Sequence, residues 1–244
     1  MMEHIIVCPF DEKLLARFKK RKIVINTIDF SLIQNIFKEV RKYNELLAIK
    51  IQTDKSLSDI SFREEWLNIP LAIYSPEFGN YKDFIQQLIL MKKLNIRIFL
   101  SCKNESNYTG LRILSSLNIS CGLFFDGEPA SWDLLNDLMH YDIYSRIKHA
   151  PVEPFAWLAS NYAPSEYTDF NSAYFNNPAR YLHINEKGQI ALTETDLTNN
   201  NFIDEGIDSL ENIYRNKKYK DFLDSRYEIM LLMNECSFCE AFRI

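Results

Sequence analysis

Glycine is scarce in this chain, at six of 244 residues. Glycine-rich loops cradle phosphate groups through backbone N–H donors, and neither GxGxxG nor GxxxxGK[ST] occurs in the sequence. Long apolar runs are also missing, because none approaches the roughly 18 residues that a membrane-spanning helix needs. Residues 1–10 are too short and wrongly flanked for a signal peptide. We therefore expect a cytoplasmic protein with no membrane partner and no glycine-rich phosphate loop.

The chain also lacks a basic face. Its formal net charge is −5, and its main basic cluster, Arg17–Lys22, lies between a predicted helix and a predicted strand. Nucleic-acid-binding domains usually concentrate positive charge on one side, so we expect no nucleic-acid partner. Hydrophobic residues make up 47% and charged residues 25% of the chain, which predicts a folded globular protein rather than a disordered one.

The cysteines number five, an odd count that argues against a disulfide framework in a cytoplasmic protein. Cys102 and Cys121 adjoin predicted strands, where a cysteine usually acts as a small buried hydrophobe. Cys236 and Cys239 form a CxxC, whose spacing allows both thiolates to bind one zinc ion or iron–sulfur cluster. Such a site needs further ligands, so a pair of free thiols is an equal alternative.

A repeat of strand and helix organises the first 150 residues. Short apolar, largely β-branched runs start roughly 23 to 26 residues apart, and an amphipathic helical pattern such as Tyr81–Leu94 separates most of them. A further helix is expected around Thr109–Leu117, after a polar stretch. The predicted strands are Ile23–Ile28, Leu46–Gln52, Pro70–Tyr74, Ile96–Leu100 and Ser120–Phe125, with His4–Cys8 as a leading strand.

This alternation predicts an α/β fold with parallel strands joined by right-handed crossovers. Five or six units are too few for a closed eight-stranded barrel, so we expect a partial, open β/α barrel over residues 1–150. A flat doubly wound sheet is the alternative. In either architecture a ligand lies at the carboxyl ends of the strands. Candidate catalytic residues there are Asp126, Glu128 and Lys103, although an Asp-Gly dipeptide is also typical of a plain turn.

The repeat ends near residue 150, and residues 151–244 form the second predicted region. It opens with prolines and an aromatic, asparagine-rich segment that either lines a binding groove or caps the barrel mouth. His149 and His183 have no metal-ligand partner at suitable spacing and are expected to be hydrogen-bonded structural histidines. The candidate peptide-binding residues in the aromatic segment are Trp157, Asn161, Tyr162, Tyr167 and Asp169.

Tyr181–Leu192 predicts a β-hairpin, because alternating strands flank a loop with glycine at its end. Gly206–Met233 then has a helical pattern broken near Asn216, and it leads to the CxxC. From the hairpin onward the chain resembles the C-terminal SPASM or twitch region of radical SAM peptide-maturation enzymes. The resemblance is carried by Tyr181–Leu192, by Tyr214–Tyr219 and by the sequence from Cys236 to Ile244.

The resemblance implies a partial barrel upstream and a role in peptide modification. Radical SAM enzymes hold their cluster with CxxxCxxC after the first strand, whereas the segment Asp29–Asn35, which follows Ile23–Ile28 here, contains no cysteine. We therefore expect a degenerate, non-catalytic accessory protein that binds a precursor peptide or a partner maturase, through the aromatic segment and the hairpin edge. The alternatives are a partial-barrel enzyme that uses the strand-end carboxylates, and a metal or iron–sulfur module at the CxxC.

Overall fold

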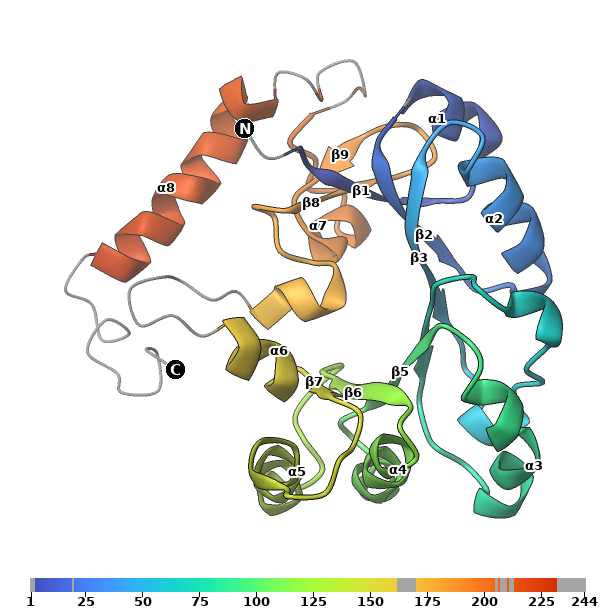
Figure 1. Cartoon of the computed structure of the whole chain (residues 1–244). Coiled ribbons are helices and arrows are strands. Elements are labelled where there is room, and N and C mark those ends of the chain that lie inside the picture. Colours follow the sequence, from blue (N-terminus) through green and yellow to red (C-terminus); the bar gives the residue numbers. More distant parts are fainter. Residues whose placement is uncertain are drawn as a thin grey trace.

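The protein contains a nine-stranded, mostly parallel sheet flanked by helices (Figure 1). The structure is a computed structural model that describes residues 3–18, 20–161, 170–204, 206, 210 and 213–231. The α/β class that the strand–helix alternation predicts is confirmed. The strands are β1 (Ile5–Pro9), β2 (Lys22–Thr27), β3 (Glu45–Gln52), β4 (Leu71–Ser75), β5 (Ile96–Ser101), β6 (Ser120–Phe124), β7 (Val152–Glu153), β8 (Tyr181–Ile184) and β9 (Ile190–Ala191).

The order of the strands in the sheet is β7-β6-β5-β4-β3-β2-β1-β8-β9. All neighbours pair in parallel except β8 and β9, which form an antiparallel hairpin. The two edges are β7 and β9, so the sheet does not close on itself. Strands from residues 151–244 thus extend both sides of the sheet built by the first 150 residues, with β7 beside β6 and β8 beside β1.

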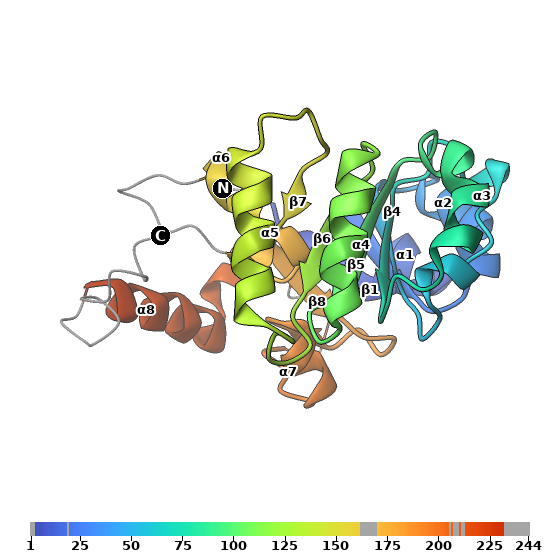
Figure 2. The same ribbon diagram turned by 90° about the horizontal axis from the view of Figure 1, so that it is seen from below.

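Five helices, α1 to α5, lie along one side of the sheet, which we call the outer face (Figures 1 and 2). Crossovers of one hand that step steadily in one direction place their helices on one face. The opposite side, the inner face, contacts the short helical turn η4 (Phe170–Tyr174). The bounds of the helices and of the other helical turns are α1 (Glu12–Arg17), α2 (Ile33–Val40), α3 (Tyr81–Met91), α4 (Glu105–Ser116), α5 (Trp132–Tyr144), α6 (Phe155–Asn161), α7 (Glu194–Thr198), α8 (Lys217–Leu231), η1 (Phe30–Leu32), η2 (Leu57–Asp59) and η3 (Glu64–Trp66).

The main hydrophobic core lies between the outer face and the helices. Alternate strand residues, such as Ile25, Ile49 and Ile73, are fully buried there against α2, α3 and α4. Burial of each such side chain stabilises the folded state by roughly 1.5–3 kcal/mol. The strand residues between them point to the inner face and form two small clusters, one containing Val24 and the other containing Tyr74. The inner face is therefore only partly apolar.

The expected helix over Tyr81–Leu94 is confirmed as α3, whereas the predicted start of the next helix was wrong. The sequence predicts a helix from about Thr109, but α4 begins at Glu105. Asn104 caps it, because its side-chain oxygen accepts a hydrogen bond from the N–H of Ser106 at 3.0 Å. The polar stretch before Thr109 is thus the first turn of the helix rather than a loop.

The predicted hairpin is confirmed. Gly188 has a φ of 86°, and its N–H donates to the Asn185 carbonyl at 2.9 Å, which closes the turn between β8 and β9. Helix α8 begins directly after Asn216, where the sequence pattern predicts a break. Its buried Tyr219 contacts the body of the protein through a 2.8 Å hydrogen bond with His4. None of the helices within the described residues is long and apolar enough to span a membrane.

Candidate functional site

Polar side chains gather on the inner face near the carboxyl ends of β2, β3 and β4. Asn26 of β2 is the register partner of Lys50 on β3, and Gln52 of β3 is the partner of Tyr74 on β4. Successive residues of a strand point to opposite faces, so Lys50 and Gln52 face inward while Ile49 and Ile51 enter the main core. The sheet register therefore concentrates polar groups in one area of the face opposite α1 to α5.

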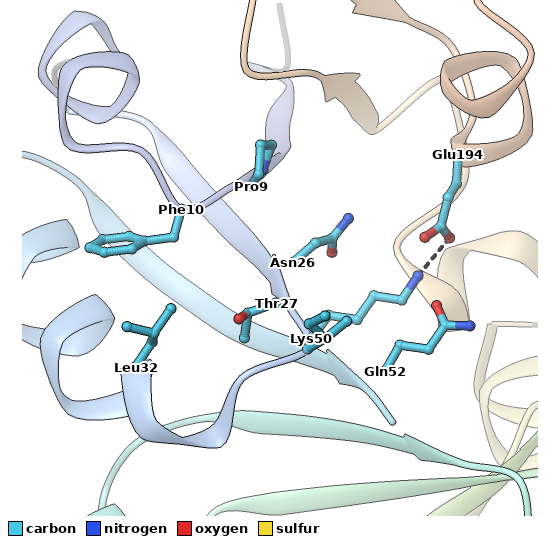
Figure 3. Close-up of a pocket in the computed structure, with 9 residues that line it drawn as sticks. Pro9, Phe10, Asn26, Thr27, Leu32, Lys50, Gln52 and Glu194 are labelled. Carbon is cyan, nitrogen blue, oxygen red and sulfur yellow. Dashed lines mark hydrogen bonds and ion pairs between the residues drawn. The ribbon is translucent and has the colours of Figure 1, made fainter. Parts of the chain in front are cut away.

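An ion pair between a buried lysine and a partly exposed glutamate forms the centre of this area. The Nζ atom of Lys50 lies 2.6 Å from Oε2 of Glu194, the first residue of α7 (Figure 3). The Lys50 side chain is 8% exposed and that of Glu194 is 40% exposed. The ammonium group also lies 5.0 Å from the centre of the Tyr74 ring, within the range of a cation–π contact. A buried ammonium needs such compensation, because leaving it without an anion costs several kcal/mol.

The position of Glu194 depends on the chain before and after the hairpin. The Thr193 side chain caps α7 by accepting from the N–H of Asp196 at 3.0 Å. The N–H of Glu194 donates to the Asn176 side chain at 3.0 Å, which ties the start of α7 to the segment after η4. These contacts hold the carboxylate of Glu194 above β3.

Two cavities flank the ion pair, and Lys50, Gln52 and Glu194 line both of them. The first has a volume of about 350 Å³ and extends toward β1 and β2, where Asn26 and Thr27 lie (Figure 3). The second has a volume of about 430 Å³ and extends toward β4, β6 and η4. Its other lining residues are aromatic or polar: Tyr74, Phe124, Phe125, Asp126, Phe170, Asn171, Tyr174, Asn176, Thr195 and Thr198. We call the two cavities together the inner groove.

Several buried polar atoms on the inner face have no hydrogen-bond partner within the described residues. They are Oδ1 of Asn26, the hydroxyl of Tyr74 and both ring nitrogens of His183. A buried polar group without a partner typically costs about 1–3 kcal/mol. Burial raises the pKa of Tyr74 and the charge of Glu194 raises it further, so the hydroxyl keeps its proton at neutral pH and is available as a donor. Two of these unpaired atoms, in Asn26 and Tyr74, belong to residues that line the groove.

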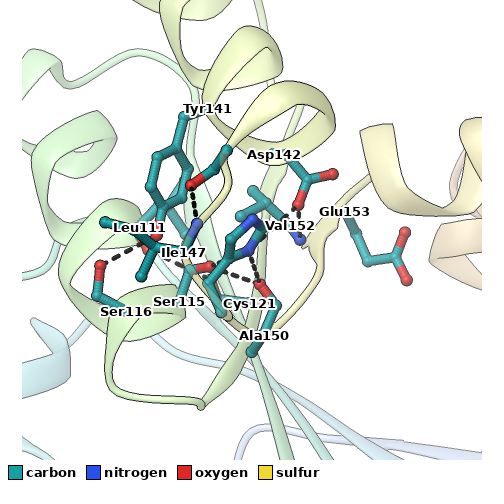
Figure 4. A network of polar contacts seen from close by, with 12 residues as sticks. Leu111, Ser115, Ser116, Cys121, Tyr141, Asp142, Ile147, Ala150, Val152 and Glu153 are labelled. Atoms are coloured by element: carbon teal, nitrogen blue, oxygen red, sulfur yellow. Dashed lines mark hydrogen bonds and ion pairs between the residues drawn. The ribbon is translucent and has the colours of Figure 1, made fainter.

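The two histidines differ from each other. His149 is a hydrogen-bonded structural histidine, as predicted, with Nδ1 2.9 Å from the Ala150 carbonyl and 3.2 Å from Ser115 Oγ. Figure 4 shows the surrounding network, in which Ser115 also contacts Ala150 and Asp142 accepts from the N–H of Val152 at 2.8 Å. His183 is also buried, but neither ring nitrogen has a partner at full hydrogen-bond geometry in the described structure, and its ring interacts only weakly with the Phe175 backbone. Burial lowers its pKa to about 4, opposed by the charge of Glu194.

The structure brings two of the three predicted catalytic residues together. Asp126 Oδ2 lies 3.5 Å from Lys103 Nζ, and Asp126 Oδ1 accepts from Ser101 Oγ at 2.8 Å. Asp126 also lines the second cavity. Glu128 is exposed and has no hydrogen bond or ion pair with any residue that the structure describes. The nearby Cys102 is buried, as predicted, and burial raises the pKa of its thiol. Cys121 is likewise buried.

Of the predicted peptide-binding residues, the structure describes Trp157 and Asn161, and it places both on α6. The Trp157 N–H donates to Glu153 at 3.0 Å, and the Asn161 side chain donates to the Trp157 carbonyl at 2.8 Å. Neither residue lines the inner groove. Tyr162, Tyr167 and Asp169 lie outside the described residues.

The hairpin edge is already partly occupied. The N–H of Ile190 donates to the Asp204 carbonyl at 2.9 Å, and the N–H of Ile203 donates to the Ile190 carbonyl at 2.8 Å. An incoming strand would have to displace this contact before it could pair with β9. Edge pairing is therefore less accessible than the hairpin pattern indicates.

Cys236 and Cys239, the predicted metal ligands, lie outside the described residues. Within the part of the chain that is described, no group of three or more histidine, cysteine or acidic side chains is arranged to hold a metal ion.

The centre of the inner groove was missed by the sequence analysis, although one signal was present. Lys50 interrupts an otherwise apolar strand, and Asn26 interrupts another. A charged residue inside a strand buried on both faces needs a partner, so such an interruption points to a polar site. Nothing local in the sequence indicates that this partner is Glu194, which is 144 residues away.

Comparisons of the chain with protein-family models, with curated proteins and with solved structures give no match. The fold and the groove define an α/β protein with a polar–aromatic cleft on the open side of its sheet.

Proposed function

We propose that the protein is a non-catalytic binding protein that takes up a segment of polypeptide in the inner groove. The observation that carries this proposal is the composition of the groove, in which side-chain amides, one ion pair and several aromatic rings line two adjoining cavities. Amide side chains such as Asn171 and Asn176 match the donors and acceptors of a peptide backbone. Aromatic rings such as Phe124 and Phe170 suit apolar side chains.

The architecture supports this position for the ligand. We infer that the sheet is an incomplete β/α barrel, because its parallel strands follow one another in order and α1 to α5 lie on one face. In a barrel of this kind the carboxyl ends of the strands form the binding side. Asn26, Gln52 and Tyr74 lie near those ends.

The resemblance to peptide-maturation enzymes supports a precursor peptide as the ligand and a modifying enzyme of the same system as a further partner. The groove is a better candidate for the peptide than the hairpin edge, because Ile203 and Asp204 already contact that edge. We assign no reaction to Asp126, since Lys103 and Ser101 engage its two carboxylate oxygens.

The proposal is tested with fluorescently labelled synthetic peptides that cover the small open reading frames beside the gene, measured by fluorescence anisotropy. Thr195 is exposed and lines the second cavity, so Thr195→Trp should fill the groove without disturbing the core. We expect Thr195→Trp to weaken binding by about tenfold or more, equivalent to roughly 1.4 kcal/mol.

The matched control is Asn199→Trp, which adds the same bulk at an exposed position directly after α7 that does not line the groove. It should leave the affinity unchanged. The proposal is overturned if no such peptide binds, or if the two tryptophan variants have the same effect.

A further inference from the structure

The two members of the central ion pair differ sharply in exposure. Lys50 comes from the middle of the sheet with its side chain 8% exposed, whereas the side chain of Glu194 is 40% exposed. Water can solvate the carboxylate of Glu194 if it leaves, but it cannot readily solvate the ammonium of Lys50. The ammonium is therefore the fixed member of the pair, and the carboxylate is the replaceable one.

Lys50 is also the only cation among the described residues that line the groove. The other charged lining residues are Glu194 and Asp126, and Asp126 is paired with Lys103. A ligand anion that enters the groove thus meets one positive centre. The Glu194 carboxylate already occupies that centre, and the charge of Asp126 is offset by its pairing with Lys103.

The surroundings of Lys50 contain a second donor for such an anion. Tyr74 lines the second cavity, and its buried hydroxyl has no partner within the described structure. The Tyr74 ring lies beneath the Lys50 ammonium at 5.0 Å, so the two groups form one unit. Glu194 contacts the ammonium through Oε2 and does not contact the Tyr74 hydroxyl. The carboxylate of a ligand has two accepting oxygens and could satisfy the ammonium and the hydroxyl together.

We propose that Lys50 and Tyr74 form a carboxylate-recognition site, and that Glu194 occupies it in place of the carboxylate of the ligand. The inference rests on the proposed function, because the ligand is taken to be a peptide. Binding displaces Glu194 toward solvent. Since the ion pair lies where the two cavities adjoin, this displacement also joins them into one groove.

The first test uses sodium acetate as the probe, on the full chain. Glu194→Ala leaves the Lys50 ammonium without its anion, so the melting temperature should fall below that of the wild type. Acetate should then restore it in a saturable way, by roughly 3–6 °C at about ten times its Kd. Acetamide and sodium chloride at equal concentration serve as controls and should not do so.

The double variant Lys50→Met/Glu194→Ala separates recognition from a general salt effect. It removes the ammonium together with its partner and should show no response to acetate beyond that of chloride. The inference is overturned if acetate stabilises the single and the double variant equally, or if acetamide acts as well as acetate. If Glu194→Ala does not fold, the same comparison is made with Glu194→Gln, which keeps the size of the side chain.

The second test compares matched peptides on the wild-type protein. A peptide that binds in the anisotropy assay is prepared with a free C-terminus, with an amidated C-terminus, and with its acidic side chains changed to amides. One of the two neutralised forms should bind roughly 10- to 100-fold more weakly, because a hydrogen bond to a charged group is considerably stronger than one to a neutral group. The form that loses affinity identifies the source of the carboxylate.

The outcomes distinguish the two proposals. If all three forms bind equally, the groove binds peptides but the carboxylate site is wrong. If no peptide binds and acetate still restores Glu194→Ala alone, the carboxylate site stands and the peptide proposal fails.

Discussion

The two faces of the sheet are built from the same strands but differ in chemistry. On the outer face, side chains such as Ile25 and Ile49 are fully buried in one continuous core under the helices. On the inner face, the neighbouring residues Asn26 and Lys50 place an unpaired amide oxygen and a buried ammonium among small apolar clusters. Among the described residues, the buried side-chain polar atoms without a partner all belong to inner-face residues.

This difference predicts where most of the stability lies and, on the proposed function, where the ligand binds. Apolar burial is the dominant favourable term in folding, so the outer face accounts for most of the stability of the sheet. Unpaired buried polar groups reduce stability and are retained where they have another role. The comparison makes three predictions about stability, of decreasing size.

The largest effect should come from a pair of adjacent residues on β2. Ile25→Ala removes a fully buried side chain from the main core and should lower the free energy of unfolding by about 2–5 kcal/mol. Asn26→Ala removes an amide whose oxygen has no partner in the described structure, so it should change that free energy by less than about 1 kcal/mol. Urea denaturation of both variants measures the difference. Equal losses would contradict the assignment of the two faces to different roles.

Much of the outer face could be predicted from the sequence, because its signals are local. Runs of β-branched residues mark the strands, and the helical spacing of apolar residues marks α3. The hairpin turn has an equally local signal, because Gly188 supplies the positive φ that the turn requires. The early start of α4 was missed because the prediction gave more weight to polarity than to the capping residue Asn104. That information was present in the chain.

The inner groove could not be predicted in the same way, because it depends on contacts between distant segments. Lys50 meets Glu194 only after β8 pairs with β1 and α7 follows the hairpin. Asp126 meets Lys103 because β5 and β6 are neighbours, so that pair was accessible from the order of the strands. Sequence reasoning therefore found the strand-end residues but missed the partner that comes from the second half of the chain.

The second prediction concerns the pH dependence of stability. The pKa of buried His183 falls from its usual 6.5 to about 4 in the folded protein. The unfolded chain therefore binds the proton first as the pH falls, and the folded state loses stability between pH 6.5 and pH 4. This shift corresponds to roughly 3 kcal/mol. His183→Leu should remove that part of the acid sensitivity, as measured by urea denaturation at pH 7, 5.5 and 4.

Exposed His140 is the control for this measurement. His140→Gln should follow the wild-type pH profile, because its side chain is solvated in both states. If His183→Leu keeps the full acid sensitivity of the wild type, the pKa of His183 is not lowered on folding. The inner face would then be better satisfied than the structure indicates.

The smallest effect should separate two buried tyrosines. The hydroxyl of Tyr108 donates to the Cys102 carbonyl at 2.9 Å, whereas the hydroxyl of Tyr74 has no partner in the described structure. Tyr108→Phe should therefore lower the free energy of unfolding by about 0.5–1.5 kcal/mol, because it removes one buried hydrogen bond while the Cys102 carbonyl keeps its 2.9 Å bond from the N–H of Ala130. Tyr74→Phe should leave it unchanged or raise it by up to about 1 kcal/mol, since it removes an unsatisfied group. A loss in Tyr74→Phe as large as that in Tyr108→Phe would remove the distinction between the two faces. A neutral Tyr74→Phe variant that also binds peptide carboxylates more weakly would show that this hydroxyl serves the ligand rather than the fold.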